Sequence, residues 1–178
     1  MGGGFDLQIT CNMQVNIANV THVAPKTIPL PRSGCPVNIS LEVFGDRWSL
    51  LIVRDLMVRG FHTFGDFQRA GEGIATNILT DRLRRLCQAG IVRAERDPGD
   101  RRQKHYRLTE KGIDLAPVLL ELLIWGAKHE QTDAPAEVIS EMARNRDAVL
   151  EETRRRWEER DPRALLPWLG GPEENDRL

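Results

Sequence analysis

The stretch of sequence that decides the fold covers residues 76–108 and reads TNILTDRLRRLCQAGIVRAERDPGDRRQKHYRL. Its first half carries leucines at helical spacing, and Gly90 ends the pattern; the leucines are Leu79, Leu83 and Leu86. Two short extended segments follow, separated by the turn residues Pro98, Gly99 and Asp100. The stretch therefore predicts an amphipathic helix over 76–89 and then a β-hairpin over about 92–108.

Helices are also predicted on the N-terminal side of this stretch. Pro36 suits the first turn of a helix because it lacks an N–H group, and Gly45 ends that helix. Asp46 is placed to cap a second helix that runs to Gly60. We expect the apolar face of this second helix to be buried: Trp48, Leu51, Ile52 and Leu56. A third, short helix begins at the capping-box-like pair Thr63 and Asp66.

Beyond the hairpin, Thr109 is predicted to cap one long helix that Pro117 kinks near its middle. A break at residues 132–135 precedes a single further amphipathic helix. Five residues share one side of that helix: Val138, Met142, Val149, Thr153 and Trp157. Because such a stripe needs a partner to be buried, we favour an additional dimer contact as its role.

The 178 residues are enough for one domain with additional terminal segments. We predict a disordered N-terminal extension over 1–34, a folded domain over 35–131, and a C-terminal helical extension with a loose tail over 132–178. No apolar run approaches the ~20 residues of a membrane helix, so no membrane partner is expected. The sequence has only three cysteines, and an odd, small number of this kind argues against a disulfide framework. This favours a protein of the cytoplasm, where thiols stay reduced.

The net charge of −1 conceals an uneven distribution. Residues 75–112 carry ten basic and five acidic side chains, a local excess of +5, whereas residues 113–178 carry nine basic and fifteen acidic ones. A basic block of this kind indicates a polyanion-binding surface, although a solvated charged face would produce the same composition.

The order of elements is that of a winged helix-turn-helix: a mainly α fold with a small β-hairpin wing. A short helix braces the basic helix 76–89, whose outer face can enter the major groove of DNA, which is about 12 Å wide. The hairpin 92–108 would then contact the backbone or the adjacent minor groove. Double-stranded DNA is therefore the expected partner.

The outer face of the basic helix supplies the candidate recognition residues: Thr76, Asn77, Thr80, Asp81, Arg82, Arg84 and Arg85. Asparagine can pair with adenine and arginine with guanine. Asp81 either accepts from a cytosine amine or holds a neighbouring arginine, and Arg82 is a phosphate candidate. The candidate wing residues, which we expect to contact phosphates, are Arg101, Arg102, Lys104 and His105.

An ordered series of motifs over residues 35–130 resembles the HxlR-type bacterial transcription regulators. The matching segments are Cys35-Pro36, Gly45-Asp46-Arg47-Trp48, Phe64-x-x-Phe67, Gly73-Ile74, Leu79-Thr80-x-Arg82-Leu83-x-x-Leu86, Gly90-Ile91-Val92 and Tyr106-x-Leu108-Thr109-x-x-Gly112. A MarR-like regulator shares the fold, but the first two segments favour the HxlR type. Many relatives open the recognition helix with Ser, whereas this chain has Ala75, so we expect either that Thr76 provides the cap or that this end of the helix frays.

The resemblance implies a homodimer that binds a pseudo-palindromic operator. We expect the protein to be associated with the bacterial nucleoid. The resemblance also implies helical dimerisation elements at both ends of the domain, which correspond here to Val37, Leu41, Phe44, Leu119, Leu122 and Trp125.

Cys35 is the candidate redox sensor. The positive end of a helix dipole favours the thiolate form of a thiol at that position. Some members of the family that the chain resembles sense oxidants or electrophiles through a cysteine at this place, and others do not. An oxidant or small-molecule effector is therefore a hypothesis, as is the purely structural alternative of a small residue at a helix start.

Motifs for other classes of function are missing from the sequence. It has no nucleophile elbow, Gly-rich phosphate loop or CxxC pair, and its histidines lack metal-ligand spacing. We therefore expect no enzyme activity, no metal and no cofactor. The alternative to a DNA-binding regulator is a winged-helix adaptor that binds another protein; such an adaptor need not keep an exposed basic face on helix 76–89.

Overall fold

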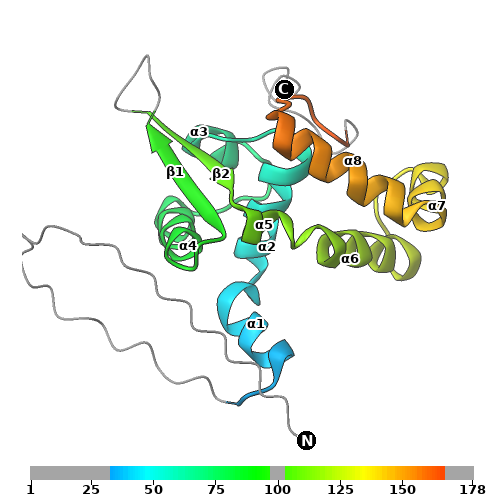
Figure 1. Cartoon of the computed structure of the whole chain (residues 1–178), viewed down its shortest axis with the longest axis horizontal. Helices are drawn as coiled ribbons and strands as arrows, with labels where there is room; N and C mark the ends of the chain where they lie inside the picture. The colour runs from blue at the N-terminus through cyan, green and yellow to red at the C-terminus, as the bar shows by residue number, and fades with distance from the viewer. Residues whose placement is uncertain (1–32, 97–102, 167–178) are drawn as a thin grey trace, which may run out of the picture. The chain divides into compact units, whose positions relative to one another are not determined.

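The computed structural model describes residues 33–96 and 103–166 of the chain (Figure 1). The predictions for the N-terminal extension concern residues outside the described ones, as do those for the wing tip and the end of the C-terminal tail. The predicted domain boundaries stay predictions.

The first two helices begin where the sequence predicts, and the first also ends there, whereas α2 ends at Arg54, before the predicted Gly60. Helix α1 spans Pro36–Phe44 and has Gly45 at its C-cap. Helix α2 spans Arg47–Arg54, and the carboxylate of Asp46 accepts a hydrogen bond from the backbone N–H of Ser49 at 3.1 Å. This cap satisfies one of the free N–H groups at the start of α2.

The chain continues from α2 into a π-helical turn, η1 (Asp55–Arg59), which ends at Gly60 with a φ of 72°. The inward face of α2 differs from the predicted one. Ile52 is buried as expected, and Val53 is fully buried beside it. The other residues of the predicted face are only half-buried: Trp48, Leu51 and Leu56.

The helix-turn-helix consists of α3 (Phe64–Gln68) and α4 (Thr76–Gln88). The predicted capping box is confirmed, because Thr63 accepts from the N–H of Asp66 and the Asp66 carboxylate accepts from the N–H of Thr63. The predicted cap of α4 is wrong. Ala75 is the N-cap and provides no side-chain bond, while the Thr76 hydroxyl accepts a hydrogen bond from the Gln68 amide at 3.0 Å.

The wing is a two-stranded antiparallel sheet of β1 (Val92–Arg96) and β2 (Lys104–Leu108). Its register pairs Val92 with Leu108, and both side chains are buried. The backbone N–H of Tyr106 donates to the carbonyl of His62 at 2.7 Å, which joins the wing to the loop before α3. The hairpin prediction is therefore confirmed for its described residues.

The long helix predicted after the wing is in fact two helices. Thr109 caps α5 (Glu110–Ile113) and accepts a hydrogen bond from Gly112 N–H at 3.2 Å. The chain then breaks, and α6 (Ala116–His129) starts with Pro117 in its first turn. Pro117 therefore begins a helix instead of kinking one, because a proline costs no hydrogen bond in a first turn.

The single helix predicted for the C-terminal extension is also two helices, α7 (Ala136–Arg144) and α8 (Arg146–Glu159), which meet at Asn145. Their apolar residues are not left for a second copy to cover. Met142 packs with Leu120 and Ile124 of α6 in one cluster, and Trp157 packs on the main core. The favoured dimer role of the stripe is therefore wrong for these contacts, since the chain buries them against itself.

The main core lies where α2, α3, α4 and the wing meet, and it includes the three predicted leucines of α4: Leu79, Leu83 and Leu86. Helices α6, α7 and α8 lie together on the other side of α2 from α4 (Figure 1). Among the described residues, no helix combines the length and the apolar character required to span a membrane.

Candidate nucleic-acid interface

Helix α4 buries one face and exposes the other, as the sequence predicts. Its leucines have exposed fractions of 2% or less. The candidate recognition residues on the opposite side are exposed, apart from Asp81 and Arg82, which are half-buried. The apolar stripe therefore fixes the rotation of α4, so that a row of polar side chains is presented to solvent.

Asp81 joins three arginines of α4. Its carboxylate is 2.7 Å from Arg84, 2.8 Å from Arg85 and 2.9 Å from Arg82. The hydrogen bond from Arg84 is the main cause of a lowered pKa for Asp81. Of the two roles considered for Asp81, holding neighbouring arginines is the one that the structure displays.

Arg82 is held inside the protein more than the other two arginines. Its Nε lies 2.9 Å from the carboxylate of Asp46, the residue that caps α2, so this ion pair links the recognition helix to α2. Only 21% of its side chain is exposed, compared with 52% for Arg84 and 61% for Arg85. The contact with DNA that was predicted for Arg82 stays a prediction.

The first turn of α4 carries uncharged polar groups. Thr76 and Asn77 are exposed, and the Thr80 hydroxyl donates to the carbonyl of Thr76 at 2.8 Å. A hydroxyl that is bonded to its own helix still has lone pairs with which to accept from a base or from water. The start of α4 thus offers hydrogen-bonding groups for base edges, and the charged groups follow further along the helix.

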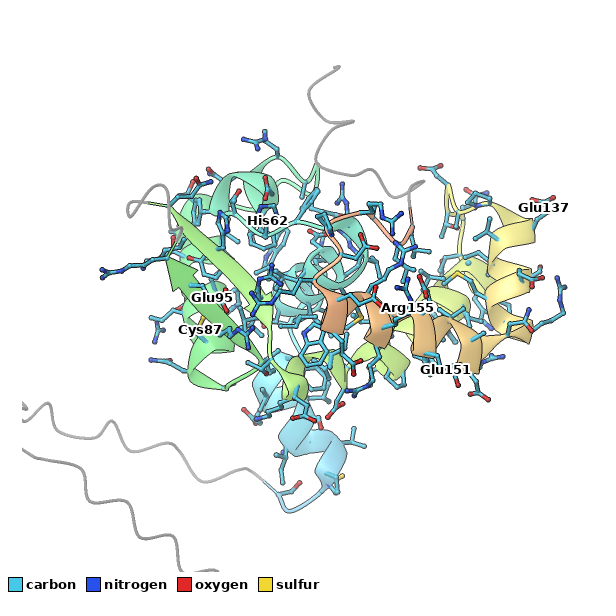
Figure 2. The ribbon with its side chains drawn as sticks, turned by 45° about the horizontal axis from the view of Figure 1, so that its top comes forward. His62, Cys87, Glu95, Glu137, Glu151 and Arg155 are labelled. Atoms are coloured by element: carbon cyan, nitrogen blue, oxygen red, sulfur yellow. The ribbon has the colours of Figure 1, made fainter. Side chains whose placement is uncertain are left out.

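The described part of the wing places Lys104 on the surface and His105 half-buried. The His105 ring packs edge-on against the ring of His62, with centroids 4.9 Å apart. His62 lies between α3 and the wing (Figure 2). His105 therefore contributes to the joint between wing and helix-turn-helix, while the predicted Arg101 and Arg102 lie outside the described residues.

Three further wing arginines were missed by sequence reasoning. Arg96 is exposed and pairs in register with Lys104, which sets two cations directly opposite each other. Arg93 pairs in register with Arg107, and Glu95 lies 2.7 Å from Arg93 and 3.7 Å from Arg107. Like charges at paired positions destabilise a hairpin, so this arrangement favours a polyanion as the partner of the wing. Their position on the predicted strands was a signal that could have identified them.

The predicted dimerisation residues fall into two groups. Four are exposed despite being large and apolar: Val37 66%, Leu41 57%, Leu122 48% and Trp125 58%. Phe44 and Leu119 instead pack against the main core of their own chain. Sequence reasoning missed Ile39 and Val118, which are exposed on the same two helices. Helices α1 and α6 therefore carry apolar side chains that the described part of the chain leaves uncovered.

The two described cysteines differ in their surroundings. Cys35 is exposed and occupies the N-cap position of α1. Cys87 is half-buried beside the core, and burial raises the pKa of its thiol. Cys87 therefore has the character of a packing residue, whereas Cys35 is accessible to a reagent. The described residues contain no group of three or more metal-ligating side chains.

The end of the molecule away from α4 carries acidic and basic side chains that pair with each other, as Arg155 does with Glu152 and Glu159. Glu137 on α7 and Glu151 on α8 are exposed and point away from the neighbouring helices (Figure 2). Negative charge would be repelled by phosphates. The helix-turn-helix and the wing are thus the surface whose charge suits a nucleic acid.

A helix-turn-helix braced on a core, with a basic hairpin beside it, defines the winged helix-turn-helix class of DNA-binding proteins. The comparisons assign the family. Residues 43–134 match the model of the HxlR-like helix-turn-helix family. The chain belongs to this family, as its motifs predicted.

Similar proteins are helix-turn-helix transcriptional regulators. The chain is 35% identical over 101 residues to the uncharacterised regulator YybR of Bacillus subtilis, a match that covers 57% of this chain and 80% of YybR. It is 36% identical over 96 residues to the uncharacterised regulator Rv3095 of Mycobacterium tuberculosis, covering 54% of this chain and 60% of that protein. The chain is accordingly a transcription regulator of the HxlR winged-helix type.

Solved structures agree with this assignment. The crystal structure of PA1607 has a TM-score of 0.53 and 39% identity, and the match covers 59% of this chain and 72% of PA1607. The oxidised form of the redox regulator HypR has a TM-score of 0.50 and 30% identity, with 55% of this chain and all of HypR covered. Residues after 134 lie outside the family match, so α7 and α8 are additions to it.

Proposed function

We propose that the protein acts as a homodimer on a pseudo-palindromic operator, with α4 of each copy in the major groove. The observation that supports this most strongly is the exposed polar face of α4 opposite its buried leucine stripe. In this arrangement Asn77 and Thr80 contact base edges near the start of α4, and Arg84 and Arg85 contact guanines or phosphates.

The wing supplies affinity that does not depend on sequence. Arg96 and Lys104 are exposed at the paired ends of the two strands, and the predicted tip arginines, Arg101 and Arg102, come shortly before Lys104 in the sequence. Phosphate contacts of this kind weaken as salt is added, because they release condensed counterions. Replacing Arg101 and Arg102 together with Ala should weaken binding to all DNA sequences and flatten the salt dependence.

The dimer would form through the exposed apolar side chains of α1 and α6. Val37 and Leu41 lie one turn apart on α1, and Leu122 and Trp125 lie one turn apart on α6. Large side chains of this kind are stabilised when a second copy removes them from water. The dimer places two α4 helices at the spacing of an operator with twofold symmetry.

A redox response through Cys35 is part of the proposal. The thiol is exposed at the start of α1, a helix that also carries predicted dimer residues, and the similar protein HypR is described as a redox regulator. Two Cys35 thiols, one from each copy, would lose two protons and two electrons to one hydrogen peroxide, giving a disulfide and two waters. We expect this oxidation to alter DNA binding. A Cys35→Ser variant whose DNA binding still responds fully to peroxide would contradict this part of the proposal.

The decisive experiment is fluorescence anisotropy on DNA from upstream of the protein's own gene, with a scrambled duplex as control, over a series of salt concentrations. We expect preference for the upstream DNA and a linear loss of log affinity with log salt, at ~0.9 per phosphate contact. Absence of binding even at low salt would contradict the proposal and favour the adaptor alternative.

A further inference from the structure

A cavity of about 570 Å³ lies between α2 with η1 and the helices α6, α7 and α8. Its wall is mainly aliphatic and includes buried residues from several elements, among them Leu120, Met142 and Leu166. The volume falls within the ~300–1,000 Å³ of typical small-molecule sites, which are lined mostly by apolar side chains with a few polar groups. The cavity therefore has the size and lining of a ligand site.

Among the described residues, two charged side chains line this cavity, Arg54 and Asp133, and Arg54 is the cation. Arg54 donates from Nε to Asp55 at 2.9 Å and from Nη1 to Glu72 at 3.0 Å. Its Nη2 lies 2.7 Å from the Asp55 carboxylate, yet it is buried and has no hydrogen-bond partner. The ion pair with Asp55 therefore lacks the geometry of a hydrogen bond, and a better-placed anionic oxygen of a ligand would satisfy this buried N–H group.

The cavity is closed by residues that lie beyond the family match, which ends at residue 134. Helix α7 provides Met142, α8 provides Val149, Leu150 and Thr153, and the chain after α8 provides Leu165 and Leu166. The backbone N–H of Leu165 donates to the carbonyl of Val58 at 2.8 Å, which holds this last segment against η1. The C-terminal helices thus supply part of the cavity wall, and this part lies outside the family match.

The same arginine connects the cavity to the DNA-binding helix. Glu72 lies in the turn between α3 and α4, and the two flanking glycines, Gly71 and Gly73, have φ values of 81° and 70°. The ion pairs from Arg54 and from Arg47, at 3.0 and 3.5 Å, tie this turn to α2. A ligand that takes Arg54 away from Glu72 would loosen the turn from which α4 begins.

We propose that the cavity binds an apolar small molecule with one anionic group, which competes with Glu72 for Arg54 and so changes the DNA affinity of α4. Binding of the small molecule is argued from the cavity and Arg54, and it does not depend on the proposed function. The effect of the molecule on DNA affinity does rest on the proposed function, so binding and DNA affinity are tested by separate measurements.

Binding is tested with a matched pair of fluorescent probes on the full chain. Anilinonaphthalene sulfonate carries one anionic group, and phenylnaphthylamine is the same skeleton without it. We expect both to bind, with the sulfonate about tenfold tighter because of Arg54. Equal affinities would overturn the role of Arg54, and no saturable binding would overturn the site.

Variants locate the probe. Val149→Phe fills the cavity from α8, whereas Ala148→Phe adds the same ring to the exposed side of that helix. We expect the first to weaken both probes by about tenfold or more and the second to leave them unchanged. Equal binding in the two variants would place the probe elsewhere and overturn the proposal.

The competition is tested at Glu72. Glu72→Gln removes the rival anion, so the sulfonate should bind several-fold tighter and phenylnaphthylamine should be unaffected; Glu137→Gln on α7 is the control. An unchanged sulfonate affinity would contradict the competition.

A second copy is the rival occupant of the cavity. If a monomeric Trp125→Glu variant binds the probes much more tightly than the wild type, the dimer partner fills the cavity and the proposal is wrong.

The regulatory half is tested by repeating the anisotropy experiment with saturating sulfonate probe. We expect operator affinity to change about fivefold or more in the wild type and not in Val149→Phe. If the probe binds but operator affinity does not change, the proposed regulation is wrong, whereas the proposed binding site is retained. If no DNA is bound at all, the proposed function fails, whereas the probe measurements still decide whether the site exists.

Discussion

The indole N–H of Trp157 donates a hydrogen bond to the backbone carbonyl of Leu108 at 3.0 Å, joining α8 to the last residue of the wing. Leu108 is itself buried in the main core, and Trp157 packs against that core. The residues that follow the family match are therefore attached to the DNA-binding part of the chain.

This bond leads to a prediction for Trp157→Phe. The phenyl ring keeps most of the packing but lacks the indole N–H. We therefore expect the free energy of unfolding to fall by about 1 kcal/mol. Urea denaturation measures the free energy of unfolding. Glu158→Gln is the control, because Glu158 is exposed near the end of the same helix and its loss should change the stability by no more than about 0.5 kcal/mol. Equal effects for the two variants would contradict the assigned role of Trp157.

The sequence predicted the elements whose ends and faces are encoded locally. Leu79 and Leu83 of α4 are buried as the helical spacing requires, and Asp66 completes the capping box. Composition and short spacing suffice for such features because the determining groups lie within one or two helical turns.

The sequence did not predict features that depend on distant contacts. Pro117 fits either a kink or a first turn, and only the packing of α6 decides between them. Asn145 carries no strong stop signal, yet α7 ends there and α8 turns to bring Trp157 onto the core. Likewise, an apolar stripe indicates burial without indicating whether its own chain or a second copy covers it.

For the site, sequence reasoning identified the outer face of α4 but not how its charges are held. That Asp81 contacts three arginines follows from helical spacing only in part, since Arg82 also reaches Asp46 on another helix. The opposed pair Arg96 and Lys104 depends on the register of the hairpin, which the turn sequence alone does not fix.

Acid sensitivity is predicted from the capping box at α3. Burial would raise the pKa of Asp66, but hydrogen bonds from the backbone N–H groups of His62 and Thr63 outweigh it and hold this pKa below its ordinary value of 3.8. A depressed folded-state pKa means that the carboxylate stabilises the fold fully above the unfolded value. That contribution is lost as pH falls through the folded value.

We therefore expect Asp66→Asn to cost about 1 kcal/mol of stability at neutral pH. The difference from wild type should shrink at a pH below 3.8, as the pH falls through the lowered pKa of Asp66 and the wild-type carboxylate takes up a proton. Urea denaturation at both pH values provides the measurement, with Glu158→Gln on the exposed end of α8 as the control. A difference that stays constant over this range would show that charge is not what the cap contributes.

Asp81→Asn is predicted to strengthen nonspecific DNA binding. The change releases Arg84 and Arg85 from a carboxylate that pairs with both of them, and it adds one positive charge to the face of α4. Affinity for scrambled DNA should rise, and the salt slope should steepen by up to ~0.9. Glu137→Gln makes the same change in charge on the exposed side of α7, and should leave both quantities unaltered.

Asn77→Ala is expected to act differently from Asp81→Asn. Asn77 is exposed in the first turn of α4, and its amide can pair with adenine, so its loss should reduce preference for the operator while leaving the salt slope unchanged. Anisotropy on operator and scrambled duplexes gives both quantities. A uniform loss of affinity on the two duplexes would instead assign Asn77 to the DNA backbone.

Trp125→Glu is predicted to convert the protein to a monomer. Trp125 is 58% exposed on α6, next to the exposed Leu122 and on the same helix as Val118, so a charge there costs little in the isolated chain. In a dimer the same carboxylate would be buried against apolar side chains of the second copy, which is unfavourable unless it is paired. The variant should therefore lose dimerisation while keeping the melting temperature of its fold nearly unchanged.

Sedimentation velocity distinguishes the two states, and Ala148→Glu on the exposed side of α8 is the matched control. Val37→Glu on α1 tests whether the second predicted helix belongs to the same interface, because Val37 is 66% exposed and does not support the core. If both helices form the interface, either substitution gives a monomer whose operator affinity falls steeply, since each copy then binds one half-site alone. A dimer that survives both changes would mean that α1 and α6 are not the surfaces that meet.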